Sequence, residues 1–503
     1  DMYNVAIGHN AGGDITTGVN NTLVGGTTGQ ALTTGGNNVA MGYGALYTDD
    51  VGSHSVAIGV SALQNQNTAT AASVYNTAVG SQAGLSMTTG ISNTLIGALA
   101  GDALTDADKN VAVGQRALST DTLGSKSTAI GTDALKVQNF TTATDSYNVA
   151  VGFETGQSIT TGVQNTFVGG LAGDAQNTGT RTVAVGYNAG GGITSGDSNV
   201  AIGWQALMTE DAHSNNVAVG ASALQTQNAG AHAYNTALGF EAGKAVTTGI
   251  RNTLIGGVAG LVLTDADYNV AVGMNALSTD TLGSTSTAIG TDALQTQNFT
   301  TATNSYNTAV GYSAGNAVTT GIQNTFIGGL SGDALTDADY NVAVGTASLT
   351  ADTLGSKSTA LGYGTLSVQN FTTATDTFNT AVGYLAGENV TTGTRNTIMG
   401  ALAGDSLTTG EKNVAIGTGA LSEDDVGNRS VAVGDSALAS QNFATATDSY
   451  NTAVGNNAGL AVTTGVQNTF VGGLAGDATD DGTNNVAVGF EALSANCGSG
   501  NTT

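Results

Sequence analysis

Proline is absent from the 503 residues of this chain, and cysteine occurs once, at Cys497. A single cysteine excludes an intrachain disulfide framework, so Cys497 is either a chance residue or a link between the chains of an oligomer. The 75 glycines follow no three-residue period, which together with the missing proline excludes a collagen-like helix. Aromatic residues make up only 5% of the chain, so we predict a thin, repeated core.

Charged residues are also scarce, at 10%, and 37 acidic residues against 11 basic ones give a formal net charge of −26. Eleven cations cannot supply a groove that follows phosphates, so nucleic acid is not expected as a partner. No apolar run approaches the roughly 18 residues of a membrane helix, and we expect no membrane insertion. Val, Ile, Leu and Ala recur at fixed positions, which excludes a disordered chain.

The chain consists of copies of one motif, Asn-x-Ala-x-Gly, as in residues 76–80. Its last residue, the rung glycine, occurs 28 times, mostly in 17-residue steps such as that from Gly80 to Gly97. Every fourth step is a 21-residue step, as from Gly59 to Gly80, and one 19-residue step leads from Gly220 to Gly239. This register predicts 28 coils of a parallel β-solenoid, stacked about 4.8 Å apart into a rod of roughly 130 Å.

Groups of four coils form a 72-residue super-repeat, as from Gly8 to Gly80, whereas the block from Gly152 to Gly239 contains five coils. The fifth coil of that block reads as a duplication. We predict one continuous solenoid over residues 1–503, and we expect both ends to continue into further modules. The expected super-repeats cover residues 4–75, 76–147, 148–234, 235–306, 307–378, 379–450 and 451–503.

Within a coil, side chains of the motif alternate as in a strand, and no stretch has a helical period over ten residues. Thr-Thr-Gly, as at residues 88–90, predicts a tight turn whose glycine supplies a positive φ. The residue four before the rung glycine is Asn in 22 coils, Ser in five and Thr182 in one. We predict a structural column of side chains that form hydrogen bonds along the axis.

The middle strand position, two before the rung glycine, is Ala in 21 coils and bulky in seven. Alanine permits close approach of another backbone, so we predict that this column is buried against a partner chain. A homotrimer would supply the burial that a thin coil lacks. The candidates for the trimer axis are Ala6, Leu23, Leu95, Phe167, Leu254, Phe326, Ile398 and Phe470.

Residues 4–8, 55–59 and 413–417 resemble the head repeats of YadA-type trimeric autotransporter adhesins. The resemblance covers all 28 coils and implies a left-handed parallel β-roll with three identical chains around one axis. The 17-residue and 21-residue coils of this chain are somewhat longer than those of that family. The Thr-Thr-Gly turns and the Asn-Thr-Ala-Val-Gly form of the motif are more similar to repeats of bacteriophage tail-fibre proteins. Both kinds of relative are fibrous, extracellular and adhesive.

The 21-residue steps carry insertions such as residues 138–147, rich in Phe, Tyr, Asn and Thr. These loops are expected either to grip a glycan or a protein, or to fold back as hydrophobic clasps. The candidates for residues of protruding loops are Phe140, Tyr147, Phe299, Tyr306, Phe371, Phe443 and Tyr450.

Two further groups of residues could bind a metal or act in catalysis, but a structural explanation is simpler for both. Pairs of Asp two residues apart, at 106 and 108, 265 and 267, and 337 and 339, suit Ca²⁺ only if further oxygens join them. We expect solvated turn carboxylates and no cofactor. Trp204, Glu210, Asp211 and His213 interrupt the repeat in the duplicated coil, where drift is a simpler explanation than acid–base catalysis.

We therefore expect a non-enzymatic shaft of an extracellular appendage, such as a phage tail fibre, that positions or contributes to binding of a glycan or protein on a host surface. A bacterial surface trimeric adhesin is the first alternative. A solenoid that presents Thr and Asn to ice or to a glycan is the second, and a depolymerising tailspike is the third.

Overall fold

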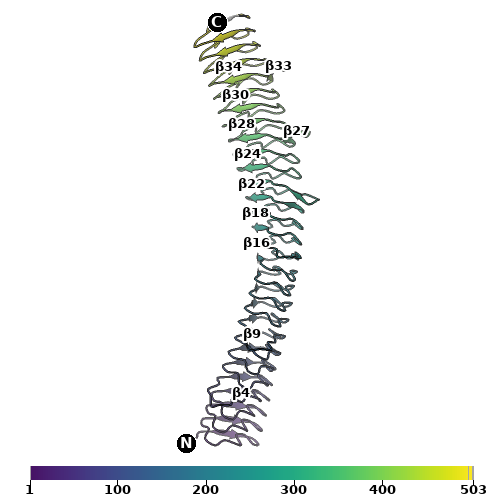
Figure 1. Ribbon diagram of the computed structural model, residues 1–503, viewed down its shortest axis with the longest axis vertical. Coiled ribbons are helices and arrows are strands. Elements are labelled where there is room, and N and C mark those ends of the chain that lie inside the picture. Colours follow the sequence, from purple (N-terminus) through teal and green to yellow (C-terminus); the bar gives the residue numbers. More distant parts are fainter. Residues whose placement is uncertain (1, 497, 501–503) are drawn as a thin grey trace. The chain divides into compact units, whose positions relative to one another are not determined.

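A computed structural model describes residues 2–496 and 498–500, and the chain divides into two compact units, Asp1–Arg251 and Asn252–Thr503. The described part of each unit contains β-strands, turns and bends but no helix. Figure 1 shows each unit as coils stacked one on the next. Each unit contributes 14 coils whose strand has three residues, among the described residues.

The three-residue strands are the motif itself and end directly before the rung glycine. Those of the first unit are β1 (Val5–Ile7), β2 (Thr22–Val24), β3 (Val39–Met41), β4 (Val56–Ile58), β5 (Thr77–Val79), β6 (Thr94–Ile96), β7 (Val111–Val113), β9 (Thr128–Ile130), β11 (Val149–Val151), β12 (Thr166–Val168), β13 (Val183–Val185), β14 (Val200–Ile202), β15 (Val217–Val219) and β16 (Thr236–Leu238).

Those of the second unit are β17 (Thr253–Ile255), β18 (Val270–Val272), β20 (Thr287–Ile289), β22 (Thr308–Val310), β23 (Thr325–Ile327), β24 (Val342–Val344), β26 (Thr359–Leu361), β28 (Thr380–Val382), β29 (Thr397–Met399), β30 (Val414–Ile416), β32 (Val431–Val433), β34 (Thr452–Val454), β35 (Thr469–Val471) and β36 (Val486–Val488).

Two-residue strands form short extra ladders beside four of the insertions. They are β8 (Gly124–Ser125) with β10 (Thr144–Asp145), β19 (Gly283–Ser284) with β21 (Thr303–Asn304), β25 (Gly355–Ser356) with β27 (Thr375–Asp376), and β31 (Gly427–Asn428) with β33 (Thr447–Asp448).

Successive three-residue strands pair in parallel and in register. Thr77 is opposite Thr94 and Val79 is opposite Ile96, so each 17-residue coil returns the chain to the same ladder. In a 21-residue step, as from Val56 to Thr77, the strands still pair in register and the extra residues lie outside the ladder. The predicted parallel β-solenoid is confirmed.

The middle strand position does not face outward, and the assignment of this column to a trimer axis is wrong. Each of the seven bulky residues is fully buried inside the coil of the single chain. The alternating pattern of a strand sends the middle side chain inward and its two neighbours outward. Ala6, in the first coil, is exposed. The corrected residues are Leu23, Leu95, Phe167, Leu254, Phe326, Ile398 and Phe470.

The rung glycines are required by both backbone conformation and contact. Gly80 has φ +144°, and an added Cβ would lie 2.4 Å from the carbonyl oxygen of Gly97 in the next coil. The Thr-Thr-Gly turns differ from the prediction, because Gly90 and Gly162 do not have a positive φ. An added Cβ at Gly90 would instead meet the carbonyl oxygen of Ala107 at 2.4 Å, so close stacking of coils excludes a side chain there.

The asparagine column forms hydrogen bonds along the axis as predicted. The Asn21 backbone N–H donates to Oδ1 of Asn4 at 2.8 Å, and the Asn38 N–H donates to Oδ1 of Asn21 at 3.0 Å. The Asn21 side-chain Nδ2 donates to the Gly35 carbonyl at 2.9 Å. Asn21 and Asn38 are fully buried, and the side chain of each thereby pairs with one backbone carbonyl and one backbone amide of other residues.

Candidate functional site

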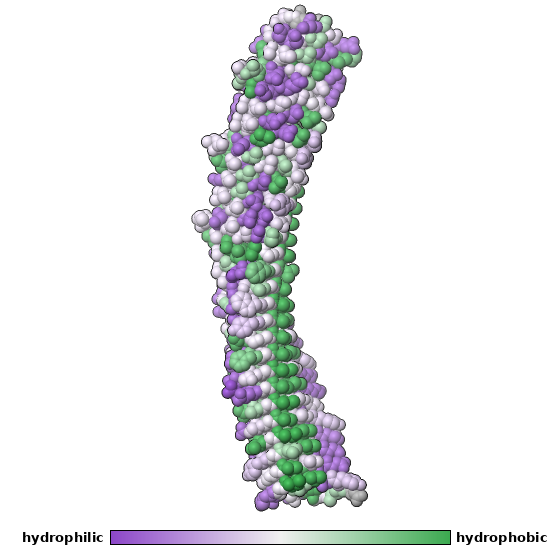
Figure 2. Space-filling model, turned by 180° about the vertical axis from the view of Figure 1, so that it is seen from behind, coloured by the Kyte–Doolittle hydropathy of each residue, from purple (hydrophilic) through white to green (hydrophobic). Residues whose placement is uncertain are grey.

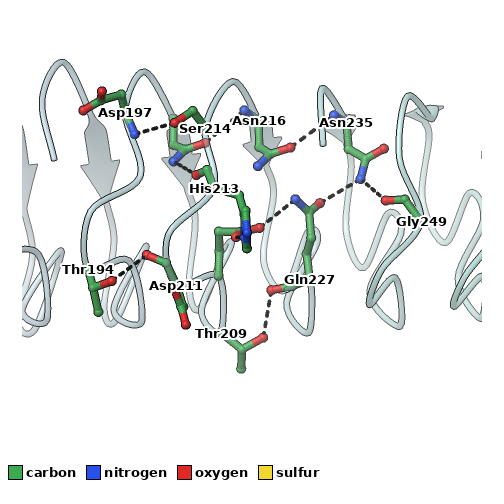
Figure 3. A network of polar contacts seen from close by, with 12 residues as sticks. Thr194, Asp197, Thr209, Asp211, His213, Ser214, Asn216, Gln227, Asn235 and Gly249 are labelled. Carbon is green, nitrogen blue, oxygen red and sulfur yellow. Dashed lines mark hydrogen bonds and ion pairs between the residues drawn. The ribbon is translucent and has the colours of Figure 1, made fainter. Parts of the chain in front are cut away.

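The off-pattern coil contains a buried carboxylate whose partners are all internal (Figure 3). Glu210 is fully buried, and its Oε1 lies 2.7 Å from Nδ1 of His213. Its Oε2 accepts a hydrogen bond from Nε2 of Gln227 at 2.8 Å, and Oε1 of Gln227 accepts from Nδ2 of Asn235 at 3.0 Å. Trp204 and Asp211 are exposed and make no side-chain contact with this group in any hydrogen bond of the described residues.

The same network recurs in five other coils with aspartate in place of Glu210. In one copy, Oδ2 of Asp121 accepts from Nε2 of Gln138 at 2.6 Å, while Oδ1 accepts from the N–H groups of Gly124 and Phe140. Because His213 stands three residues after the acid, where the other copies have glycine, its ring nitrogen replaces the glycine N–H. The Glu210 group is therefore a variant of a structural network. The other acids of the set are Asp49, Asp280, Asp352 and Asp424.

Burial shifts the titration of three of these acids. Desolvation raises the pKa of Asp49, Asp352 and Asp424 above the ordinary value of 3.8, and the hydrogen bonds from Gln66, Gln369 and Gln441 oppose that rise. The opposite shift occurs at an exposed acid, Asp145, whose pKa is lowered by the hydrogen bond from Lys126.

The aspartate pairs serve as links between coils. Oδ1 of Asp106 accepts from the Thr89 hydroxyl at 2.6 Å, and Oδ1 of Asp108 accepts from the Ile91 N–H at 2.8 Å. Asp337 and Asp339 make the same two contacts in the second unit. No cluster of three or more metal-ligating side chains occurs within residues 2–496 or 498–500.

The aromatic rings of the insertions divide into buried and exposed ones. The phenylalanine two residues after the first Gln of four insertions is buried, so these four rings do not protrude and the alternative of a ring folded back onto the coil holds for them; they are Phe140, Phe299, Phe371 and Phe443. The insertion tyrosines Tyr147, Tyr306 and Tyr450 are exposed. Threonines at the tip, such as Thr141 and Thr142, are exposed as well.

Within each unit, the outer face of the three-residue strands carries no charged side chain. The first strand residue is Thr or Val in every coil, and the third is Val, Ile, Leu or Met in every coil. No third-position residue is buried, as the exposure of Ile96 and Ile130 illustrates. Figure 2 shows hydrophobic side chains gathered as a stripe along the first unit. We call the third-position residues of all coils the aliphatic ladder.

A second column lies five residues before each rung glycine, and sequence reasoning missed it. Every described residue of this column has a positive φ. It holds eight of the 11 Lys and Arg of the chain, nine Tyr or Phe, and no Asp or Glu. Counting residue types by register would have revealed this concentration. The cations are Lys109, Lys126, Arg181, Arg251, Lys357, Arg395, Lys412 and Arg429.

Neighbouring members of this column contact one another. Lys126 Nζ lies 5.0 Å from the ring centroid of Tyr147, and the Arg429 guanidinium lies 5.5 Å from that of Tyr450. Such cation–aromatic pairs hold exposed rings in place.

Neither a ligand-sized pocket nor a helix that could cross a membrane is found in the part of the chain that the structure describes. No protein-family model matches this chain, and comparison with curated proteins gave no significant match.

Proposed function

We propose that this chain is a shaft segment of an extracellular fibre, a phage tail fibre or similar appendage, in which three copies associate around one axis. The coils are left-handed in this proposal, and the 72-residue super-repeat spaces the inserted loops along the shaft. The fibre positions or contributes to binding at a host surface, and the chain has no catalytic role. The observation that carries the proposal is the aliphatic ladder.

The ladder supports self-association because of its continuity and its lack of charge. The third residues of 14 strands in each unit are all aliphatic, and the first residues are all Thr or Val. Covering the exposed two-fifths of one such side chain, as at Ile327, is worth on the order of 1 kcal/mol. Summed over the 14 coils of a unit, this burial free energy is in the range of the free energy lost when copies give up translational and rotational freedom.

A second copy of this chain is the partner that matches the ladder. Two such copies have the same coil spacing, so their apolar side chains meet at every level. The net charge of −26 opposes contact between copies elsewhere on the surface. Closed symmetry would then bury the ladder of each copy at the axis.

A bacterial surface trimeric adhesin is the alternative, and it shares the ladder and the oligomer. The exposed insertion tyrosines and threonines are compatible with surface attachment in either setting. The Thr and Asn columns leave an ice-binding or glycan-binding solenoid as the less favoured second alternative.

Sedimentation equilibrium of the purified chain tests the proposal. We expect a mass three times 49.3 kDa. The variant Val310→Asp, Val344→Asp and Val382→Asp places charges on the ladder of the second unit and should shift the mass to that of one chain. A wild-type mass of 49.3 kDa at micromolar concentration would contradict the proposal.

A matched control places the same charges on another exposed column. Thr346, Thr418 and Asn456 each follow a rung glycine and are not part of the ladder. Their triple replacement by Asp should leave the mass unchanged. Dissociation in the control variant as well would assign the effect to net charge and would remove the ladder as its cause.

A further inference from the structure

We propose that one stretch of the second column, which we call the aromatic corner, binds an extended, uncharged polysaccharide that runs along the solenoid axis. This inference rests on the proposed extracellular, adhesive function and names the ligand class and the site. The aromatic corner consists of Tyr268, Thr285, Tyr306, Gln323, Tyr340, Lys357 and Phe378.

Aromatic and polar residues alternate strictly along the corner. The seven residues precede strands that pair successively from β18 to β28, so they occupy seven consecutive coils of the second unit. Tyr268, Tyr306, Tyr340 and Phe378 are 48%, 55%, 48% and 49% exposed. One exposed ring therefore occurs at every second coil, at a spacing of about 10 Å.

That spacing suits a ribbon-like glycan. In an extended β-1,4-linked chain, successive sugar rings turn alternate faces to one side, so every second ring presents the same apolar face. One disaccharide of such a chain is close in length to two coils. Each exposed ring can then stack on one sugar face, while the polar residue between two rings meets hydroxyl groups.

The backbone keeps the platform rigid. The N–H groups of Thr285, Gln323, Tyr340 and Lys357 each donate to a carbonyl one coil earlier, at 2.9, 2.7, 3.1 and 3.0 Å. Lys357 Nζ also lies 5.3 Å from the ring centroid of Phe378. Because this surface is already ordered before a ligand binds, little binding free energy is lost in ordering the protein.

The choice of residues is not explained by the backbone. Tyr268, Tyr306, Tyr340 and Phe378 have φ between 51° and 62°, a conformation that costs a bulky residue about 1 kcal/mol. Leu277 has the same conformation, but it is fully buried, and burial offsets that cost. At the corner the rings stay exposed, although Asn484 shows that asparagine fits this position.

The charges at the corner favour an uncharged ligand. Lys357 is paired with Asp376 at 2.5 Å, so this ion pair adds no net charge while it offers both a donor and an acceptor. No acidic residue belongs to the corner itself. The net charge of −26 on the whole chain disfavours a polyanion.

Native affinity electrophoresis of the full chain tests the inference. The gels contain hydroxyethyl cellulose, galactomannan, dextran or alginate. We expect hydroxyethyl cellulose and galactomannan to retard the chain, whereas dextran, which is not a ribbon, and anionic alginate do not. The variant Tyr268→Asn, Tyr306→Asn, Tyr340→Asn and Phe378→Asn should lose affinity by at least about tenfold.

The matched control is Tyr312→Thr, Tyr363→Thr and Tyr384→Thr, three exposed rings that directly follow rung glycines. Threonine is native at this position in other coils, as at Thr291 and Thr346. The control should bind like the wild type. Circular dichroism must show the wild-type fold in both variants.

Several outcomes would overturn the inference. They are no retardation by either neutral ribbon, equal retardation by dextran, equal loss in the control variant, and retardation by alginate that survives the quadruple variant. A quadruple variant that changes the mass in sedimentation assigns the corner to contacts between copies and also overturns it. Wild-type monomers that still bind glycan contradict the proposed trimer and leave the corner intact.

Discussion

Phe167 and Gly173 share one space inside the coil. A Cβ added at Gly173 would lie 2.8 Å from the Phe167 ring, which is fully buried. In all seven coils with a bulky middle residue, the residue six positions later is glycine. Coils such as that of Ala112 and Leu118 have the reverse arrangement, with alanine in the middle and leucine six residues later. In these two kinds of coil the interior is therefore filled either by the middle strand residue or by the residue six positions later. In a third kind, such as that of Ala78 and Gly84, both residues are small, and Leu63 and Leu95 of the neighbouring coils approach the space.

Exchanging the two residues tests this relation. Phe167→Ala leaves a cavity and should cost about 3–5 kcal/mol of unfolding free energy. Gly173→Ala forces a methyl group into the ring and should cost about 1–3 kcal/mol. The double variant Phe167→Ala with Gly173→Leu copies the native arrangement of Ala112 and Leu118, including a positive φ at the leucine, so it should recover most of the loss.

Denaturant unfolding at one fixed protein concentration measures all three variants, because any self-association would make stability depend on concentration. Additive losses in the double variant would contradict the shared space. Hydrogen exchange in the coils on either side should report the same order of effects, since neighbouring coils carry the coupling in a repeat protein.

The buried acids hold the insertions onto the coils. Asp121→Ala would leave three buried donors, on Gly124, Gln138 and Phe140, without their acceptor. Unsatisfied buried groups of this kind should lower the unfolding free energy by about 3 kcal/mol or more. The control is Asp145→Ala, an exposed acid on the same insertion, which should change stability little. Equal effects in thermal unfolding would show that burial of the carboxylate is unimportant.

Acidification should stabilise the fold over a defined range. The folded-state pKa values of Asp49, Asp352 and Asp424 are raised above 3.8, so the folded chain takes up protons more readily than the unfolded chain. Their contribution is complete below about pH 3.8 and is lost as the pH rises through the folded-state values. We expect the unfolding midpoint in urea to rise as the pH falls from 7 toward 4.

A variant separates this effect from relief of the general negative charge. Asp352→Asn removes one buried titrating group, so its midpoint should depend less on pH than that of the wild type. Asp337→Asn removes an exposed acid and changes the net charge by the same amount, so it is the matched control. If both variants behave like the wild type, repulsion between surface charges is the cause.

Several elements of the structure were predictable from the sequence because the repeat fixes them. The 17-residue step determines that Thr77 pairs with Thr94, and alternation determines that Ala78 differs in direction from both neighbours. The direction itself was predicted wrongly, since a column of alanines reads equally as a small interior or as a close interface. The aliphatic residues at Val79 and Ile96 decide the question, because neither is buried whereas Ala78 is.

The candidate sites were harder to predict, because they depend on distances between coils. For Glu210 and His213 the sequence favours drift in a duplicated coil, with acid–base catalysis as the alternative, and only the matching contacts of Asp121 show that they form a variant of a repeated network. Phe140 and Tyr147 belong to one insertion, yet the first is buried and the second exposed. The sequence places both residues in the same insertion, but it does not determine which of the two rings is buried.

The asparagine column should contribute measurably to the unfolding free energy. Nδ2 of Asn396 donates to the Gly410 carbonyl at 2.8 Å, and its Oδ1 accepts from the Asn413 N–H at 2.9 Å. Asn396→Ala leaves both buried backbone groups unpaired, which should cost about 2–5 kcal/mol. Asn456→Ala, at an exposed asparagine, is the control and should stay within about 0.5 kcal/mol of the wild type. Urea unfolding of both variants decides, and a loss at Asn396 no larger than that at Asn456 would mean that water replaces the missing side chain inside the coil.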